Sequence, residues 1–182
     1  MRADLGVSDH SGWAVLNALG GDPAAPELIL RRRLQLIDER LPRQVYHAVA
    51  EQGRPRSLIP EVLESAQRES EREFAGVVGE LGAAGYETTR IAIAGKPEPP
   101  PALERILASH ALLHGAEGQL YRDVLAEAGS SAGLEVTRFI GRELGVVASI
   151  AIGLAAASIE SHIREVGEAV GARWAADQKR AG

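Results

Sequence analysis

Cysteine is absent from this chain of 182 residues, which excludes disulfides and thiolate metal sites. Aromatic residues make up only 4% of the sequence and hydrophobic residues 45%, so we expect an aliphatic core with close contacts between helices. The longest apolar run, residues 144–157, is too short for a membrane span. Residues 1–20 lack the basic start and apolar centre of a signal peptide. We therefore expect a cytoplasmic protein that does not contact a membrane.

Positive charge is also in short supply, because the formal net charge is −5 at pH 7 and the isoelectric point about 5.6. This balance argues against a broad basic surface for nucleic acid, although a local basic patch remains open. The chain is long enough to bury a proper core and shows no internal repeat or linker. We expect a single domain over residues 1–182.

The distribution of apolar residues predicts an α/β fold. Strand-like alternation or β-branched composition occurs at residues 3–8, 13–19, 28–37, 88–94 and 134–140. Helical periodicity occurs at residues 61–81, 102–132 and 143 onward, whereas prolines make residues 38–60 irregular. The order is therefore β-β-β-α-β-α-β-α. Short turns make the first three strands an antiparallel meander, and helical crossovers make the last two parallel to a neighbour, which gives a mixed five-stranded sheet flanked by helices.

The stretch "GVSDHSGWAVL", residues 6–16, places an acid, an imidazole and two hydroxyls in the bend between the first two strands. It is either a polar hairpin tip or one wall of an active site. A serine nucleophile is disfavoured, because neighbouring residues in a bend cannot easily adopt the serine–histidine–acid geometry and no "GxSxG" occurs.

A second polar group follows one face of the predicted helix 102–132. His110 and His114 are four residues apart, a spacing that can bind a transition metal, although "HExxH" is absent. The group either forms an ordinary hydrogen-bonded helix flank or lines a binding pocket over the ends of the strands, next to the bend. The residues of this predicted pocket are Ser11, His47, His110, His114, Glu117 and Tyr121.

The element order and the opening bend together resemble the ribonuclease H-like superfamily, in particular its Holliday-junction-resolvase-like branch and a bacterial family within it. In that branch an apolar strand ends in an acid, a glycine bend follows, and "Gly-aromatic-Ala-Val" starts the next strand. Asp9 falls one residue later than that acid. "SHALLHGAEGQLYRDVLAEAGSSAGLEVTRF" resembles the long helix and fifth strand of the branch, and "GARWAADQKRAG" its later, acid-bearing helix, which could continue beyond Gly182.

The resemblance implies a nuclease site in which acids bind two Mg²⁺ or Mn²⁺ ions for phosphodiester cleavage. It implies Asp9 and Asp177 as catalytic residues and metal ligands, with Glu98 or Glu117 as the third acid. His10, next to Asp9 in the bend, is a further catalytic candidate. However, "RIAIAGKPEPP" has Gly95 and Lys96 where an acid should leave the fourth strand. A lysine there would repel the cation.

Two hypotheses of function therefore stand side by side. The first is a divergent metal-dependent nuclease that acts on nucleic acid. The second is a non-catalytic domain of the same fold that binds a protein partner or a small ligand through the pocket around His10, His47 and His114. The apolar helix over residues 144–157 should be buried, either across the sheet or against a second copy, and we expect a homodimer.

Overall fold

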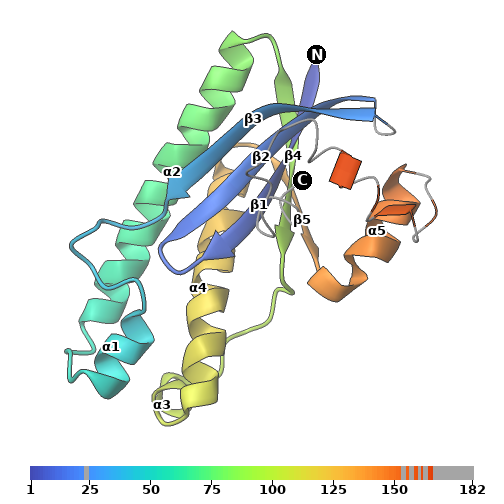
Figure 1. Ribbon diagram of the computed structural model, residues 1–182. Coiled ribbons are helices and arrows are strands. Elements are labelled where there is room, and N and C mark those ends of the chain that lie inside the picture. The colour runs from blue at the N-terminus through green and yellow to red at the C-terminus, as the bar shows by residue number, and fades with distance from the viewer. Residues whose placement is uncertain (23–24, 153–154, 156–157, 160, 162–163, 166–182) are drawn as a thin grey trace.

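The computed structural model describes residues 1–22 and 25–152 together with residues 155, 158, 159, 161, 164 and 165. Five strands form one sheet in the order β3-β2-β1-β4-β5, with β1 in the centre (Figure 1). The strands are β1 (Arg2–His10), β2 (Trp13–Asp22), β3 (Ala25–Gln35), β4 (Glu87–Ala94) and β5 (Glu135–Phe139). The antiparallel β1–β2 and β2–β3 pairs and the parallel β1–β4 and β4–β5 pairs confirm the predicted mixed sheet.

Strand β1 is longer than the sequence predicted, and this changes where its polar end lies. Asp9 pairs with Ala14 and His10 with Trp13, so both residues belong to the strand rather than to the bend. The turn consists of Ser11 and Gly12 alone, and Gly12 has a φ of 82°, a conformation that glycine adopts without steric cost.

Because side chains alternate along a strand, Asp9 and His10 lie on opposite faces of the sheet. Asp9 shares its face with Leu5 and Val7, which are buried in the hydrophobic core. His10 lies on the other face, on the side of its cross-strand partner Trp13. The strand therefore separates two residues that the sequence placed in one site.

Two long helices, α2 (Leu58–Ala83) and α4 (His110–Ser131), pack on each other and against the sheet. The main core lies between these helices and the sheet. Its largest fully buried side chains include Tyr121 of α4, Phe74 of α2 and Leu16 of β2. Gly129 lets α4 approach closely, because a Cβ atom there would lie 3.1 Å from Cγ2 of Ile91 on β4.

The helical end of the molecule differs from the sequence-based prediction in two ways. Residues 38–60 contain a short helix, α1 (Val45–Glu51), that the prolines had led us to treat as irregular. The single helix expected over residues 102–132 is divided into α3 (Leu103–Leu107) and α4, because Ser109 adopts an extended conformation with φ −139° and ψ 114°. The break places His110 in the first turn of α4, beside α1.

The remaining elements are the 3₁₀ turn η1 (Gly141–Glu143) and helix α5 (Leu144–Ile152). Figure 1 shows α5 on the far side of β5 from α2. The second part of the apolar run predicted as one helix, residues 153–157, lies mostly outside the described residues. Within the described part of the chain, no helix is both long and apolar enough to cross a membrane.

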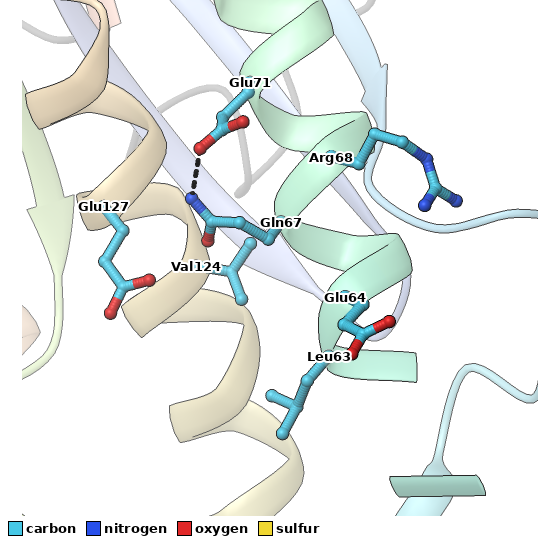
Figure 2. Close-up of a pocket in the computed structure, with 7 residues that line it drawn as sticks. All are labelled: Leu63, Glu64, Gln67, Arg68, Glu71, Val124 and Glu127. Carbon is cyan, nitrogen blue, oxygen red and sulfur yellow. Dashed lines mark hydrogen bonds between the residues drawn. The ribbon is translucent and has the colours of Figure 1, made fainter. Parts of the chain in front are cut away.

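A shallow hollow lies between α2 and α4, and Figure 2 shows the side chains that line it. Glu64, Arg68, Glu71 and Glu127 contribute charge, and the Gln67 amide donates a 2.7 Å hydrogen bond to Glu71. None of the candidate residues from the sequence lines this hollow, so it is not the site that the sequence predicted.

Candidate functional site

Asp9, the first predicted metal ligand, forms an ion pair with an arginine. Its Oδ2 atom lies 3.3 Å from the NH1 atom of Arg122 on α4. Both side chains are largely enclosed, with exposed fractions of 16% for Asp9 and 24% for Arg122. The pair therefore connects the end of the central strand to the helix that covers it.

Two glycines provide the space that the Arg122 side chain occupies. A Cβ atom at Gly95, directly after β4, would lie 2.4 Å from Cδ and 2.6 Å from Nε of Arg122. A Cβ atom at Gly118 on α4 would lie 2.8 Å from NH1. Gly95 also has a φ of 119°, which other residues rarely adopt. Arg122 thus fills the position from which the resemblance would have an acid leave the fourth strand.

The described residues around Asp9 do not fit the two Mg²⁺ or Mn²⁺ ions that the resemblance implies. These ions require several oxygen ligands, whereas the nearest charged partner of Asp9 is a guanidinium. Glu98 is solvent-exposed in the loop between β4 and α3. The same loop contains the positively charged Lys96. Asp177 lies outside the described residues, so its part in such a site stays a prediction.

His10, on the other face of the sheet, packs against an aromatic ring. Its imidazole is stacked on the indole of Trp13, with ring centroids 3.8 Å apart and an angle of 5° between the planes. The Arg33 guanidinium lies 4.0 Å from the centroid of the Trp13 ring, in cation–π contact. These ring contacts give His10 a structural role in packing against Trp13. Ser11 lies in the adjacent turn.

Three of the six residues of the predicted pocket converge as a histidine cluster. The cluster is formed by His47 of α1 with His110 and His114 of α4. The His47 ring centroid lies 4.6 Å from that of His114 and 5.6 Å from that of His110. The Nε2 atoms of His110 and His114 are 3.1 Å apart. His47 is buried, whereas His110 and His114 are exposed, so the cluster opens to solvent on one side.

Two glutamates hold rings of the histidine cluster. Glu51, at the end of α1, lies 2.8 Å from Nδ1 of His110. Glu117 is buried, and its Oε1 atom accepts hydrogen bonds from the backbone amides of Tyr46 and His47 and lies 3.3 Å from Nδ1 of His47. Burial raises the pKa of Glu117, and its hydrogen bonds with His47 and Tyr46 partly oppose that change.

Tyr121 supports this end of the molecule from the core. Its hydroxyl donates a 2.7 Å hydrogen bond to the backbone carbonyl of Arg43, in the segment that leads to α1. Burial raises the pKa of Tyr121 well above its ordinary value, so the hydroxyl keeps its proton in the folded chain. Tyr121 therefore positions α1 rather than lining an open pocket.

The sequence identified the histidines and Glu117, but it missed Arg122 and Glu51. The only sequence signal for Arg122 was indirect, namely the glycine at position 95 where an acid was expected. Glu51 could not be assigned because α1 itself was not predicted.

Comparison with known proteins addresses the fold. No protein-family model matches the sequence, and no curated protein matches it either. Among solved structures, the chain is similar to "T. thermophilus RuvC in complex with Holliday junction substrate", with a TM-score of 0.56 and 9% identity over 100% of this chain and 88% of that one. It is also similar to "Thermus thermophilus RuvC structure", with a TM-score of 0.54 and 9% identity over 99% and 89% of the two chains.

The chain has the ribonuclease H-like fold. The similarity extends over the whole chain and agrees with the strand order β3-β2-β1-β4-β5. Within this ribonuclease H-like fold, Asp9 and Arg122 lie where β1 ends, and the histidine cluster lies where α1 meets the start of α4.

Proposed function

We propose that the chain is a ligand-binding domain of ribonuclease H-like fold that does not cleave phosphodiester bonds with two metal ions. The observation that carries this proposal is the position of Arg122, whose guanidinium pairs with Asp9 and fills the space beside Gly95. We place the ligand at the histidine cluster, where ring nitrogens gather at the protein surface.

Electrostatics support the absence of two-metal cleavage. A divalent ion bound by Asp9 would lie close to the Arg122 guanidinium, and like charges a few ångströms apart repel each other. The Arg122 side chain would have to move away from Gly95 and Gly118 before a metal ion could bind at Asp9. The negative net charge of the chain further weakens the case for a nucleic-acid substrate.

A divergent nuclease remains the second candidate, and the similarity to a RuvC in complex with Holliday junction substrate favours it. In this alternative Asp9, Glu98 and Asp177 would hold Mg²⁺ or Mn²⁺, His10 would assist catalysis, and the partner would be nucleic acid. The position of Asp9 near the end of the central strand is consistent with this alternative, because the resemblance expects the first acid there.

A cleavage assay separates the two candidates. The purified chain is incubated with a four-way DNA junction, single-stranded DNA and RNA in the presence of Mg²⁺ or Mn²⁺. We expect no metal-dependent cleavage by the wild type or by Asp9→Asn. The matched control is Asp4→Asn, which changes an acid of the same strand that pairs with Arg90 near the surface. Cleavage that is lost in Asp9→Asn and retained in Asp4→Asn would overturn the proposal.

A further inference from the structure

We infer that His47, His110 and His114 bind a single divalent transition-metal ion of the zinc class through their ring nitrogens. This inference names the ligand of the binding domain proposed above and rests on that proposal for its biological role. Its geometric basis is separate, because none of the three histidines contributes to the Asp9–Arg122 pair.

The spacing of the ring nitrogens suits a tetrahedral ion. One ligand atom from each histidine can be chosen so that all three lie within 4.8 Å of one another. Zinc–nitrogen bonds of 2.0–2.1 Å with tetrahedral angles would place neighbouring nitrogens about 3.3 Å apart. The Nε2 atoms of His110 and His114 are already 3.1 Å apart. Binding therefore requires the ring nitrogen of His47 to move from at most 4.8 Å to about 3.3 Å from the other two, which are already at that spacing.

The carboxylates around the histidine cluster contact Nδ1 atoms and leave the Nε2 atoms of the same rings for a metal ion. Glu51 contacts Nδ1 of His110, and Glu117 contacts Nδ1 of His47. A metal-binding histidine commonly donates its other ring N–H to a carboxylate, which fixes the tautomer and increases the basicity of the ligand nitrogen. In both rings the nitrogen left for a metal is Nε2.

The Nε2 atom of His47 has no hydrogen-bond partner among the described residues, although it is buried. The residue as a whole is 7% exposed. A buried polar atom without a partner costs about 1–3 kcal/mol, and a metal–nitrogen bond would remove that cost. The atom belongs to the same ring that Glu117 orients, so this unsatisfied nitrogen coincides with the proposed ligand position.

Charge and ligand type define the class of ion. Three neutral imidazoles add no charge, and the two nearby carboxylates of Glu51 and Glu117 would balance the charge of a divalent ion. Imidazole nitrogen suits zinc, copper, nickel and iron, whereas Mg²⁺ and Mn²⁺ prefer oxygen ligands. Three protein ligands leave one tetrahedral position for water or an external group, and the exposed rings of His110 and His114 keep that position accessible.

Metal titration of the full chain tests the inference. After treatment with a chelator and its removal, Zn²⁺ binding is measured by calorimetry, and Co²⁺ binding by the visible absorption that a tetrahedral cobalt site produces. We expect one ion per chain and a rise in the thermal midpoint with Zn²⁺, because a ligand that binds only the folded state stabilises it.

Variants of the exposed residues identify the site, because they are the least damaging to the fold. His110→Gln and His114→Gln should each abolish the Co²⁺ absorption and weaken Zn²⁺ binding by more than about a hundredfold. Glu51→Gln, which changes only the carboxylate behind His110, should weaken binding by about tenfold to a hundredfold. His10→Gln is the matched control, because this histidine lies on another part of the fold, and it should bind Zn²⁺ as the wild type does.

Failure of the wild type to bind Zn²⁺ or Co²⁺, or equal binding by His110→Gln and His114→Gln while circular dichroism shows them folded, would overturn the inference. These outcomes are distinct from failure of the proposed function. Cleavage of nucleic acid that depends on Asp9 would refute the non-catalytic domain and leave the histidine site intact.

Discussion

Arg122 determines the environment of Asp9, and its removal has a predictable energetic effect. Arg122→Ala leaves a largely buried carboxylate without its charged partner, so we expect the free energy of unfolding to fall by about 1–3 kcal/mol. Urea denaturation followed by circular dichroism measures this change.

The control for this substitution is Arg90→Ala, which removes an ion pair with Asp4 that lies nearer the surface. The exposed fractions of these two side chains are 51% and 41%, so the loss should stay within about 1 kcal/mol. Equal losses in the free energy of unfolding would show that the Asp9–Arg122 pair contributes no more to stability than a surface pair does.

The sequence could supply candidate residues but not their partners. His110, His114 and Glu117 were identified from their helical spacing and His47 from its residue type, and the structure brings the four together. Arg122 was missed because a long side chain can reach any of several acids, and only the fold decides which one. Strand β1 continues two residues beyond its predicted end. Because side chains alternate along a strand, this extension places Asp9 and His10 on opposite faces of the sheet, which the sequence did not predict.

At the scale of elements, the contact between α4 and β4 requires a residue without a side chain. A larger residue at Gly129 would press against Ile91 and Val136, so Gly129→Val should lower the free energy of unfolding by about 1–3 kcal/mol. Denaturant unfolding of the wild type and the variant measures the difference.

Gly115, on the same helix, is the matched control, because nothing lies within 4 Å of a Cβ atom there. Gly115→Ala should raise stability by about 0.5–1 kcal/mol, since alanine loses less backbone entropy than glycine in a helix. A stabilising effect at both positions would mean that α4 can move away from the sheet without cost.

The elements with strong periodicity were predicted from the sequence, and those that depend on local breaks were not. All five strands and their parallel or antiparallel pairing follow from alternation, turn residues and the length of the connections. Helix α1 was missed because it is short and lies between prolines. The break at Ser109 was missed because the apolar spacing continues through it, while the backbone there is extended.

At the scale of the whole molecule, the apolar surface of α5 bears on assembly. Val146 is 58% exposed although the helix is strongly apolar. We expect the chain to form a homodimer through this helix, so light scattering should give the mass of two chains and Val146→Glu should reduce it to that of one. Leu63→Glu, a charge at a partly exposed leucine of α2, should leave the dimer intact. A monomeric wild type would contradict this prediction.

The central position of β1 also constrains how the chain reaches its native state. Strand β1 pairs on one side with β2, its neighbour in sequence, but on the other side with β4, where Arg2 pairs with Glu87. That edge stays open until α2 and β4 have been synthesised. Pairings so distant in sequence are slow to form, since the intervening chain must lose entropy before they give any stabilisation. The early hairpin therefore carries an unpaired edge, a site for misassembly between nascent chains that closes only when β4 arrives.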